Sequence, residues 1–207
     1  MKPRTVLVYF LLFIGSATLA AQSVSEKRNF SKTLPVKKGA SLEVTNKYGT
    51  INLTTWNKDS AYILAEVEAF APNQSKLNKM FDGIEIEITG TDPVIRARTE
   101  FNQGLTSLME GFKKLTDEIL DYDSRVQINY YISIPEYLDI RIENQFGDVI
   151  MENTTGEMSI SVTNGEFKAN SVNRITNLTL NFSDATINSV KSAKISATFS
   201  ELVIGEA

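Results

Sequence analysis

The sequence predicts an all-β protein whose last third is a right-handed β-solenoid, preceded by a β-rich part that contains two helices. Three observations lead to this expectation. Within 41–135, several segments alternate apolar and polar residues, which is typical of strands with one buried face. Residues 138–207 repeat an apolar pattern about every 18 positions. A short motif, Asn-x-aromatic-Gly, occurs at 46–49 and again at 144–147.

The N-terminus has the layout of a secretory signal peptide. Lys2 and Arg4 precede nine consecutive apolar residues, and small residues then lead to Ala20 and Ala21. A retained membrane anchor is the alternative, but crossing a bilayer takes about 20 apolar residues. We therefore expect residues 1–21 to be removed and the protein to reach the periplasm, the cell surface or the medium. Removing the two positive charges changes the formal net charge from −4 to −6.

The remaining residues, 22–207, have a length that suits a single domain. The chain contains no His and no Cys, which excludes histidine-based catalytic triads, the usual zinc sites and disulfides. No glycine-rich nucleotide-binding motif occurs. The acidic balance gives no reason to bind nucleic acid or an anionic membrane. These absences favour a protein that is not an enzyme and that needs no cofactor.

In the β-rich part, 27–137, the period of the apolar residues separates strands from helices. Alternation predicts strands over the following segments: 41–53, 61–69, 84–90, 93–101 and 125–135. The strands at 84–90 and 93–101 are expected to pair across a short turn. Helical spacing predicts helices near 73–82 and over 104–121.

The repeats in 138–207 place equivalent residues in columns. One column holds Ile142, Ile160, Leu178 and Ile195, and a second holds Val149, Phe167, Ala185 and Leu202. Coils of this length cannot bury an apolar face alone, so we expect them to stack at about 4.8 Å with each column as an internal ladder. Gly147 and Gly165 share a column that Ser183 and Ser200 continue. Because glycine tolerates a positive φ, a tight corner is expected there.

These motifs resemble those of a known family. Asn-x-[Tyr/Phe]-Gly-x-[Ile/Val] at 46–51 is followed by Trp56, and later come Ile-Asn-Tyr-Tyr-Ile-Ser-Ile-Pro at 128–135 and Asn-x-Phe-Gly-Asp-Val at 144–149. The pattern is similar to that of the bacterial putative-adhesin domain family, which is of unknown function and occurs in Bacteroidetes-type secreted proteins. The resemblance implies a β-helix-like fold, an envelope or extracellular location and no established reaction. The amphipathic segment 104–121 is a departure from it.

Two acidic clusters are candidate cation sites. Asp148, Glu166, Asp184 and Glu201 fall in one repeat column. If the coils stack, Ca²⁺ would relieve the repulsion between these carboxylates and gain oxygen ligands. The alternative, which we favour, is that acidic residues simply occupy solvated turns. The second cluster, at the end of the helix predicted at 104–121, consists of Asp117, Glu118, Asp121 and Asp123, and a solvated helix end is again favoured.

The column of Phe146, Phe182 and Phe199, whose offset Tyr48 shares, has two interpretations. We expect an internal aromatic ladder, because aliphatic residues flank these rings. The alternative is an exposed platform on which sugars stack. The helix at 104–121 is likewise expected to cover an open part of the sheet, with a docking surface as the alternative.

Two functions fit these features. The first is an exported, non-enzymatic structural or adhesion module that binds an envelope protein or a glycan. The second is a β-helical enzyme that acts on polysaccharides, which would need carboxylates and basic residues in one groove. The sequence 200–207 stops within a coil, so either the chain is shortened or its last coil pairs with a partner, such as a second copy.

Overall fold

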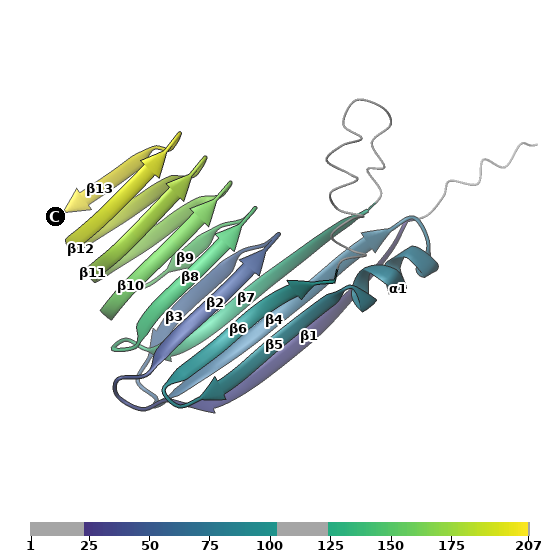
Figure 1. The fold of residues 1–207 in the computed structure, drawn as a ribbon, viewed down its shortest axis with the longest axis horizontal. Coiled ribbons are helices and arrows are strands. Elements are labelled where there is room, and N and C mark those ends of the chain that lie inside the picture. Colours follow the sequence, from purple (N-terminus) through teal and green to yellow (C-terminus); the bar gives the residue numbers. More distant parts are fainter. Residues whose placement is uncertain (1–22, 103–123, 207) are drawn as a thin grey trace, which may run out of the picture.

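The computed structural model describes residues 23–102 and 124–206. Figure 1 shows a row of strands that runs from a helix-bearing end to a series of short parallel layers. In chain order the elements are β1 (Val24–Pro35), β2 (Ser41–Lys47), β3 (Ile51–Trp56), β4 (Ser60–Ala71), α1 (Gln74–Asp82), β5 (Ile84–Thr91), β6 (Val94–Phe101), β7 (Arg125–Pro135), β8 (Asp139–Gln145), β9 (Val149–Met151), β10 (Thr154–Thr163), β11 (Glu166–Asn181), β12 (Asp184–Thr198) and β13 (Leu202–Glu206). The predicted signal peptide and the helix predicted at 104–121 lie outside the described residues.

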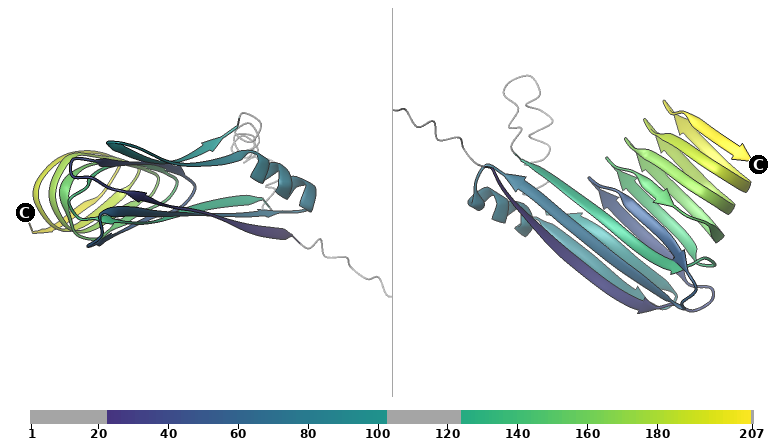
Figure 2. Two further views of the ribbon diagram at one scale, coloured as in Figure 1. Left: turned by 90° about the horizontal axis from the view of Figure 1, so that it is seen from below. Right: turned by 180° about the vertical axis from the view of Figure 1, so that it is seen from behind.

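All of these strands belong to one hydrogen-bonded sheet that folds back on itself. Its order is β1-β4-β7-β3-β9-β11-β10-β8-β2-β6-β5, with β12 beside β11 and β13 beside β12. The fold-back occurs at β11, whose first residues pair with β9 while its later residues pair with β10. Seen along the row, the strands surround a common interior (Figure 2). The sheet therefore has two facing parts, and the bends that join these parts lie above one another in successive layers.

The layers in 138–206 have the register that the sequence repeats predict. Ile142 pairs with Ile160, Ile160 with Leu178, and Leu178 with Ile195, all in parallel strands. The first three of these side chains are fully buried. On the facing side, Phe167 pairs with both Val149 and Ala185. The predicted stacking of equivalent residues is therefore confirmed, and the two columns face each other across the core.

The other half of the sheet contains antiparallel pairs and the helix. β1, β4 and β7 pair antiparallel, and β5 pairs with β6 as the sequence predicts. The predicted helix near 73–82 is confirmed as α1. The Asn73 side chain caps its start by accepting a hydrogen bond from the Lys76 backbone N–H, and Leu77, Met80 and Phe81 bury its apolar face. Of the two predicted helices, α1 is the one that falls within the described residues.

The corner between the two parts differs from the prediction in one respect. In each layer, the residue with the positive φ is the one just before the column that contains Gly147 and Gly165. Phe146, for example, has φ +57°, whereas the next residue, Gly147, does not have a positive φ. Glycine is needed there for another reason. A Cβ at Gly147 would lie 2.1 Å from the Gly49 carbonyl oxygen, and one at Gly165 would lie 2.1 Å from that of Gly147. Close approach of successive backbones, rather than backbone conformation, requires glycine at positions 147 and 165.

Buried polar groups tie the layers together beside this corner. The Asn144 Nδ2 donates to the carbonyl oxygens of Gly49 and Asp148, both at 2.9 Å. The Thr99 hydroxyl donates to Asn46 Oδ1 at 3.1 Å and lies 3.0 Å from the Tyr130 hydroxyl. Burial raises the pKa of the Tyr130 phenol to about 12. The Asn of the repeated motif therefore has a structural role, because its amide satisfies backbone carbonyls inside the bend.

Candidate functional site

A row of side chains runs along the corner, with one residue from each layer. Its members are Tyr48, Phe146, Asn164, Phe182 and Phe199, and each has a left-handed backbone with φ between +50° and +66°. We call these five residues the corner row. For aromatic residues this conformation costs roughly 1–2 kcal/mol each. Of the five residues, Asn164 is of the type that best tolerates the left-handed conformation.

No aromatic member of the corner row is buried, so the expectation of an internal aromatic ladder is wrong. Phe182 is 61% exposed and Phe199 is 79% exposed, while Tyr48 and Phe146 are half-buried. The physical reason is the left-handed residue itself. It interrupts the in–out alternation of the strand, so the side chain leaves the interior that its sequence offset predicts. The exposed rings of Phe182 and Phe199 agree with the alternative in one respect, their exposure; stacking of sugars on them stays a prediction.

The aromatic rings of the corner row form two stacks. The Tyr48 and Phe146 ring centroids are 5.4 Å apart with planes 13° apart, and those of Phe182 and Phe199 are 5.1 Å apart with planes 11° apart. Phe101 meets the Tyr48 ring edge-on at 5.8 Å, and the Lys47 ammonium lies 4.9 Å from the Tyr48 centroid. These spacings are close to the distance between neighbouring strands, so the backbone layers set the positions of the rings.

A row of polar residues precedes the corner row by one position. Parallel pairing places Lys47, Gln145, Thr163, Asn181 and Thr198 in one register. Their amide, hydroxyl and ammonium groups can donate hydrogen bonds, and all but the ammonium can also accept them. The rings are therefore flanked on this side by groups suited to a hydroxylated ligand.

The predicted carboxylate column forms the other flank. Asp148 Oδ1 accepts from the Glu166 backbone N–H, and Asp184 Oδ1 accepts from that of Glu201, both at 2.9 Å. The Lys168 ammonium pairs with Glu166 at 2.7 Å, and this hydrogen bond raises the lysine pKa. These contacts give Asp148 and Asp184 a role in joining layers. The favoured expectation, acidic residues in solvated turns, and its calcium-binding alternative both stay untested for this column, and the cluster at 117–123 lies outside the described residues.

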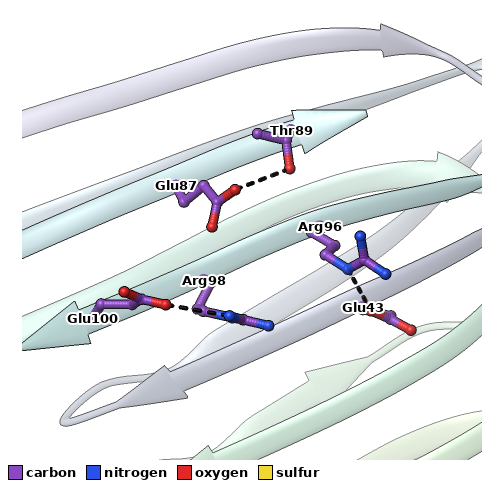
Figure 3. Close-up of polar contacts among 6 residues, drawn as sticks. All are labelled: Glu43, Glu87, Thr89, Arg96, Arg98 and Glu100. Carbon is purple, nitrogen blue, oxygen red and sulfur yellow. Dashed lines mark hydrogen bonds and ion pairs between the residues drawn. The ribbon is translucent and has the colours of Figure 1, made fainter. Parts of the chain in front are cut away.

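Charged side chains cover a second surface, on the outer side of β5, β6, β2 and β8. Figure 3 shows Glu43 with Arg96 and Arg98 with Glu100, whose closest N–O distances are 2.8 Å and 3.2 Å. A polar cavity of about 210 Å³ lies on this surface. Its charged lining residues are Glu43, Arg96, Arg98, Arg141 and Glu143. Cross-strand pairs of this kind are usual on a solvated sheet face.

The described residues thus define an all-β protein with one helix and with a row of mostly aromatic side chains along its corner, of which Phe182 and Phe199 are the exposed rings. Over those residues, no helix is both long enough and apolar enough to cross a membrane. No group of three or more Asp or Glu residues there is arranged to hold a metal ion. Sequence reasoning named most members of the corner row, but it missed Asn164 as a surface residue and the polar flank.

Comparisons with known proteins agree with the motif resemblance. No protein-family model matches the chain, and no curated protein matches it. Among solved structures, one named a putative cell adhesion protein, from Clostridium sporogenes, is 10% identical, with a TM-score of 0.45 over 88% of this chain and 100% of that one. A second, named a putative adhesin, from Parabacteroides distasonis, is 11% identical, with a TM-score of 0.36 over 85% and 73%.

A third solved structure, also from Parabacteroides distasonis, is named a putative lipid binding protein. It is 8% identical, with a TM-score of 0.26 over 88% of this chain and 95% of that one. The chain therefore resembles structures named putative adhesins, as the motifs predicted. All three TM-scores are below 0.5, so none of these likenesses bears on the function of this chain.

Proposed function

We propose that this chain is an exported, non-enzymatic binding module that holds a neutral glycan along the corner row. Its last third, in this proposal, winds as a right-handed β-solenoid, and the module acts in the periplasm, on the cell surface or in the medium. The exposure of Phe182 and Phe199 on strained backbone is the observation that carries the proposal. Local conflicts with ordinary folding preferences tend to occur where a protein functions.

The chemistry of the corner suits a sugar. The negative face of an aromatic ring attracts the C–H groups on the apolar face of a pyranose. Hydroxyl groups at the sugar edge can bond to the polar row that contains Thr163 and Asn181. The carboxylates of Asp148 and Asp184 lie on the other flank and repel anionic ligands. A neutral glycan therefore fits better than a uronic acid polymer.

The alternative function, a polysaccharide-active enzyme, has one observation in its favour. The polar cavity on the second surface brings Glu43 and Glu143 together with arginines. A glycosidase needs one carboxyl group as acid and a second as base or nucleophile. Here Glu43 is already engaged by Arg96, which supports the binding module over the enzyme.

Binding and turnover can be separated on one set of glycans. A glycan array run beside a reducing-end release assay should give binding without cleavage. Removing both exposed rings, Phe182→Ala with Phe199→Ala, should weaken binding roughly 5- to 150-fold, from about 0.5–1.5 kcal/mol for each ring. Phe30→Ala is the matched control, because Phe30 is 39% exposed but lies on β1, away from the corner row. Unchanged affinity in the double variant would refute the proposal, and cleavage would support the enzyme.

A second copy of the chain is a further partner that we propose. Among the described strands, β13 pairs only with β12, so its outer edge offers backbone groups to another strand. Val203 on this strand is 50% exposed. Light scattering after size exclusion tests the proposal, since a monomer at high concentration argues against it.

A further inference from the structure

A cavity of about 420 Å³ lies between the turn that follows β3 and the turn that follows β7. These two strands pair in parallel with Trp56 beside Pro135, so both turns leave the sheet side by side. The residues that line the cavity include Trp56, Lys58, Asp59, Glu136 and Tyr137. None of them belongs to the corner row or to its flanks, so the cavity is separate from the proposed glycan surface.

Hydrogen bonds hold the two aromatic side chains of this cavity in place. The Trp56 indole N–H donates to the Ser60 carbonyl oxygen at 2.7 Å. The Tyr137 hydroxyl donates to Asp59 Oδ1 at 2.9 Å, and this bond joins the two turns. Because the indole uses its one polar group within the protein, the part that it can offer to a ligand is the face of its ring. The aromatic walls of the cavity are therefore oriented before any ligand binds.

The charges of the cavity favour a cation. Lys58 contributes one positive charge and Asp59 and Glu136 contribute two negative charges, so the net charge is −1. The Glu136 backbone carbonyl accepts hydrogen bonds from the N–H groups of Thr155 and Gly156. Its carboxylate, in contrast, forms neither a hydrogen bond nor an ion pair with the described residues. A cation in the cavity would gain from the negative face of an aromatic ring and from this free carboxylate.

A cation of the protein itself already lies over the tryptophan. The Lys58 ammonium is 4.6 Å from the centroid of the Trp56 ring. Lys58 is exposed, and within the described part of the chain it forms no ion pair with Asp59 or Glu136, although all three line the cavity. The lysine thus marks the ring face as a place for positive charge. Because an exposed contact of this kind is weak, a ligand cation can displace the lysine.

We propose that this cavity binds a quaternary ammonium group, which replaces the Lys58 ammonium over the Trp56 ring. A quaternary ammonium has no N–H group to satisfy, so the aromatic walls and the Glu136 carboxylate provide all the contacts that it needs. A primary ammonium carries three donors and is strongly hydrated, so it gains less from aromatic rings. The class of ligand is therefore a small molecule or headgroup of the choline type.

Trp56 is the only tryptophan of the chain, so its intrinsic fluorescence reports directly on this cavity. Choline and tetramethylammonium should change the fluorescence, with sodium chloride at equal concentration as the control for ionic strength. Dimethylbutanol, the uncharged carbon analogue of choline, should bind at least about tenfold more weakly, because it lacks the charge that the ring and the carboxylate attract. Titration calorimetry gives a second measure of each affinity.

Three substitutions separate the roles of the charged residues. Glu136→Gln removes a charge from a side chain that holds no other group, so it should weaken choline binding about threefold or more without lowering the melting temperature. Lys58→Ala removes the internal competitor and should strengthen choline binding about 2- to 5-fold. Lys191→Ala is the matched control, because Lys191 is an exposed lysine on β12 outside the cavity, and it should leave the affinity unchanged.

Several results would overturn the proposal. Equal binding of choline and dimethylbutanol would mean that the cavity is merely apolar. Weaker choline binding by Lys58→Ala would mean that the lysine belongs to the site and does not compete for it. Tighter binding of Nα-acetyl-lysine amide than of choline would assign the cavity to a primary ammonium. If neither fluorescence nor calorimetry detects choline, the proposal is wrong.

The ammonium site and the glycan surface can fail independently. The double variant Phe182→Ala with Phe199→Ala should bind choline like the wild type, because these rings do not line the cavity. Glu136→Gln should likewise leave glycan binding unchanged. Loss of choline binding in the double variant would contradict a separate site, whereas a protein that binds choline but no glycan would refute only the proposed function.

Discussion

Gly147→Ala tests whether glycine at this position is required for close approach of the layers. The added Cβ would lie 2.1 Å from the Gly49 carbonyl oxygen and 2.6 Å from its carbon. An ordinary contact needs about 3.4 Å, so the backbones must separate by more than 1 Å. No side-chain rotation relieves the clash, because both groups belong to the backbone.

The cost follows from the hydrogen bonds that this separation breaks. The Ile51 N–H donates to the Asp148 carbonyl at 2.9 Å, and Asn144 Nδ2 donates to Gly49 at 2.9 Å. Losing two bonds, one of them from a buried amide, costs about 3 kcal/mol. For a domain of this length, the melting temperature should fall by about 6–12 °C.

Thermal and urea unfolding of Gly147→Ala and of a matched control variant test this reasoning. Gly39→Ala is the control, since Gly39 has φ +83° but an added Cβ would meet nothing within 4 Å. It should cost about 1 kcal/mol from backbone conformation alone. If Gly147→Ala destabilises the protein no more than Gly39→Ala does, close approach is not the reason for glycine at position 147.

Two further changes probe the buried groups beside the corner. Asn144→Ala should lower the free energy of unfolding by about 2 kcal/mol, because two carbonyls lose their donor. Gln145→Ala, at the exposed neighbouring position, should change this free energy by less than about 0.5 kcal/mol. Urea unfolding of both variants compares the two effects, and equal effects would contradict this role for Asn144. The raised pKa of Tyr130, about 12, means that the folded state favours the neutral phenol. The stabilisation is complete below pH 10 and is lost as the pH rises through 12, a loss of about 3 kcal/mol that Tyr130→Phe should remove. Parallel pH-dependent unfolding curves for wild type and Tyr130→Phe would rule out this linkage.

Periodicity predicted the interior much better than the corner. Columns such as Ile142 with Ile160 follow from the repeat, because a buried face requires the same kind of residue in every layer. The exposure of Phe182 could not be read in the same way. One left-handed residue shifts the alternation of the strand, and phenylalanine is not a residue type that predicts a left-handed backbone.

Other parts of the fold depend on pairing that local patterns do not encode. β1 is mostly exposed along its length, so its residues lack the alternation that marks a strand, and only its pairing with β4 defines it. The two neighbours of β3 are β9 and β7, both distant in the sequence. The Asp148 carboxylate accepts a hydrogen bond from the backbone N–H of Glu166 in the next layer. The column of acidic residues in the sequence had indicated only repulsion between carboxylates.

The stacked layers have an evolutionary consequence. In residues 154–198 each layer forms its strand pairs with the layer before and the layer after, so its fit depends on nearest neighbours alone. Duplication of one such unit of about 18 residues would lengthen the molecule without remodelling either end. It would also insert one more position into the corner row, so that the number of layers would set the length of the binding surface proposed above.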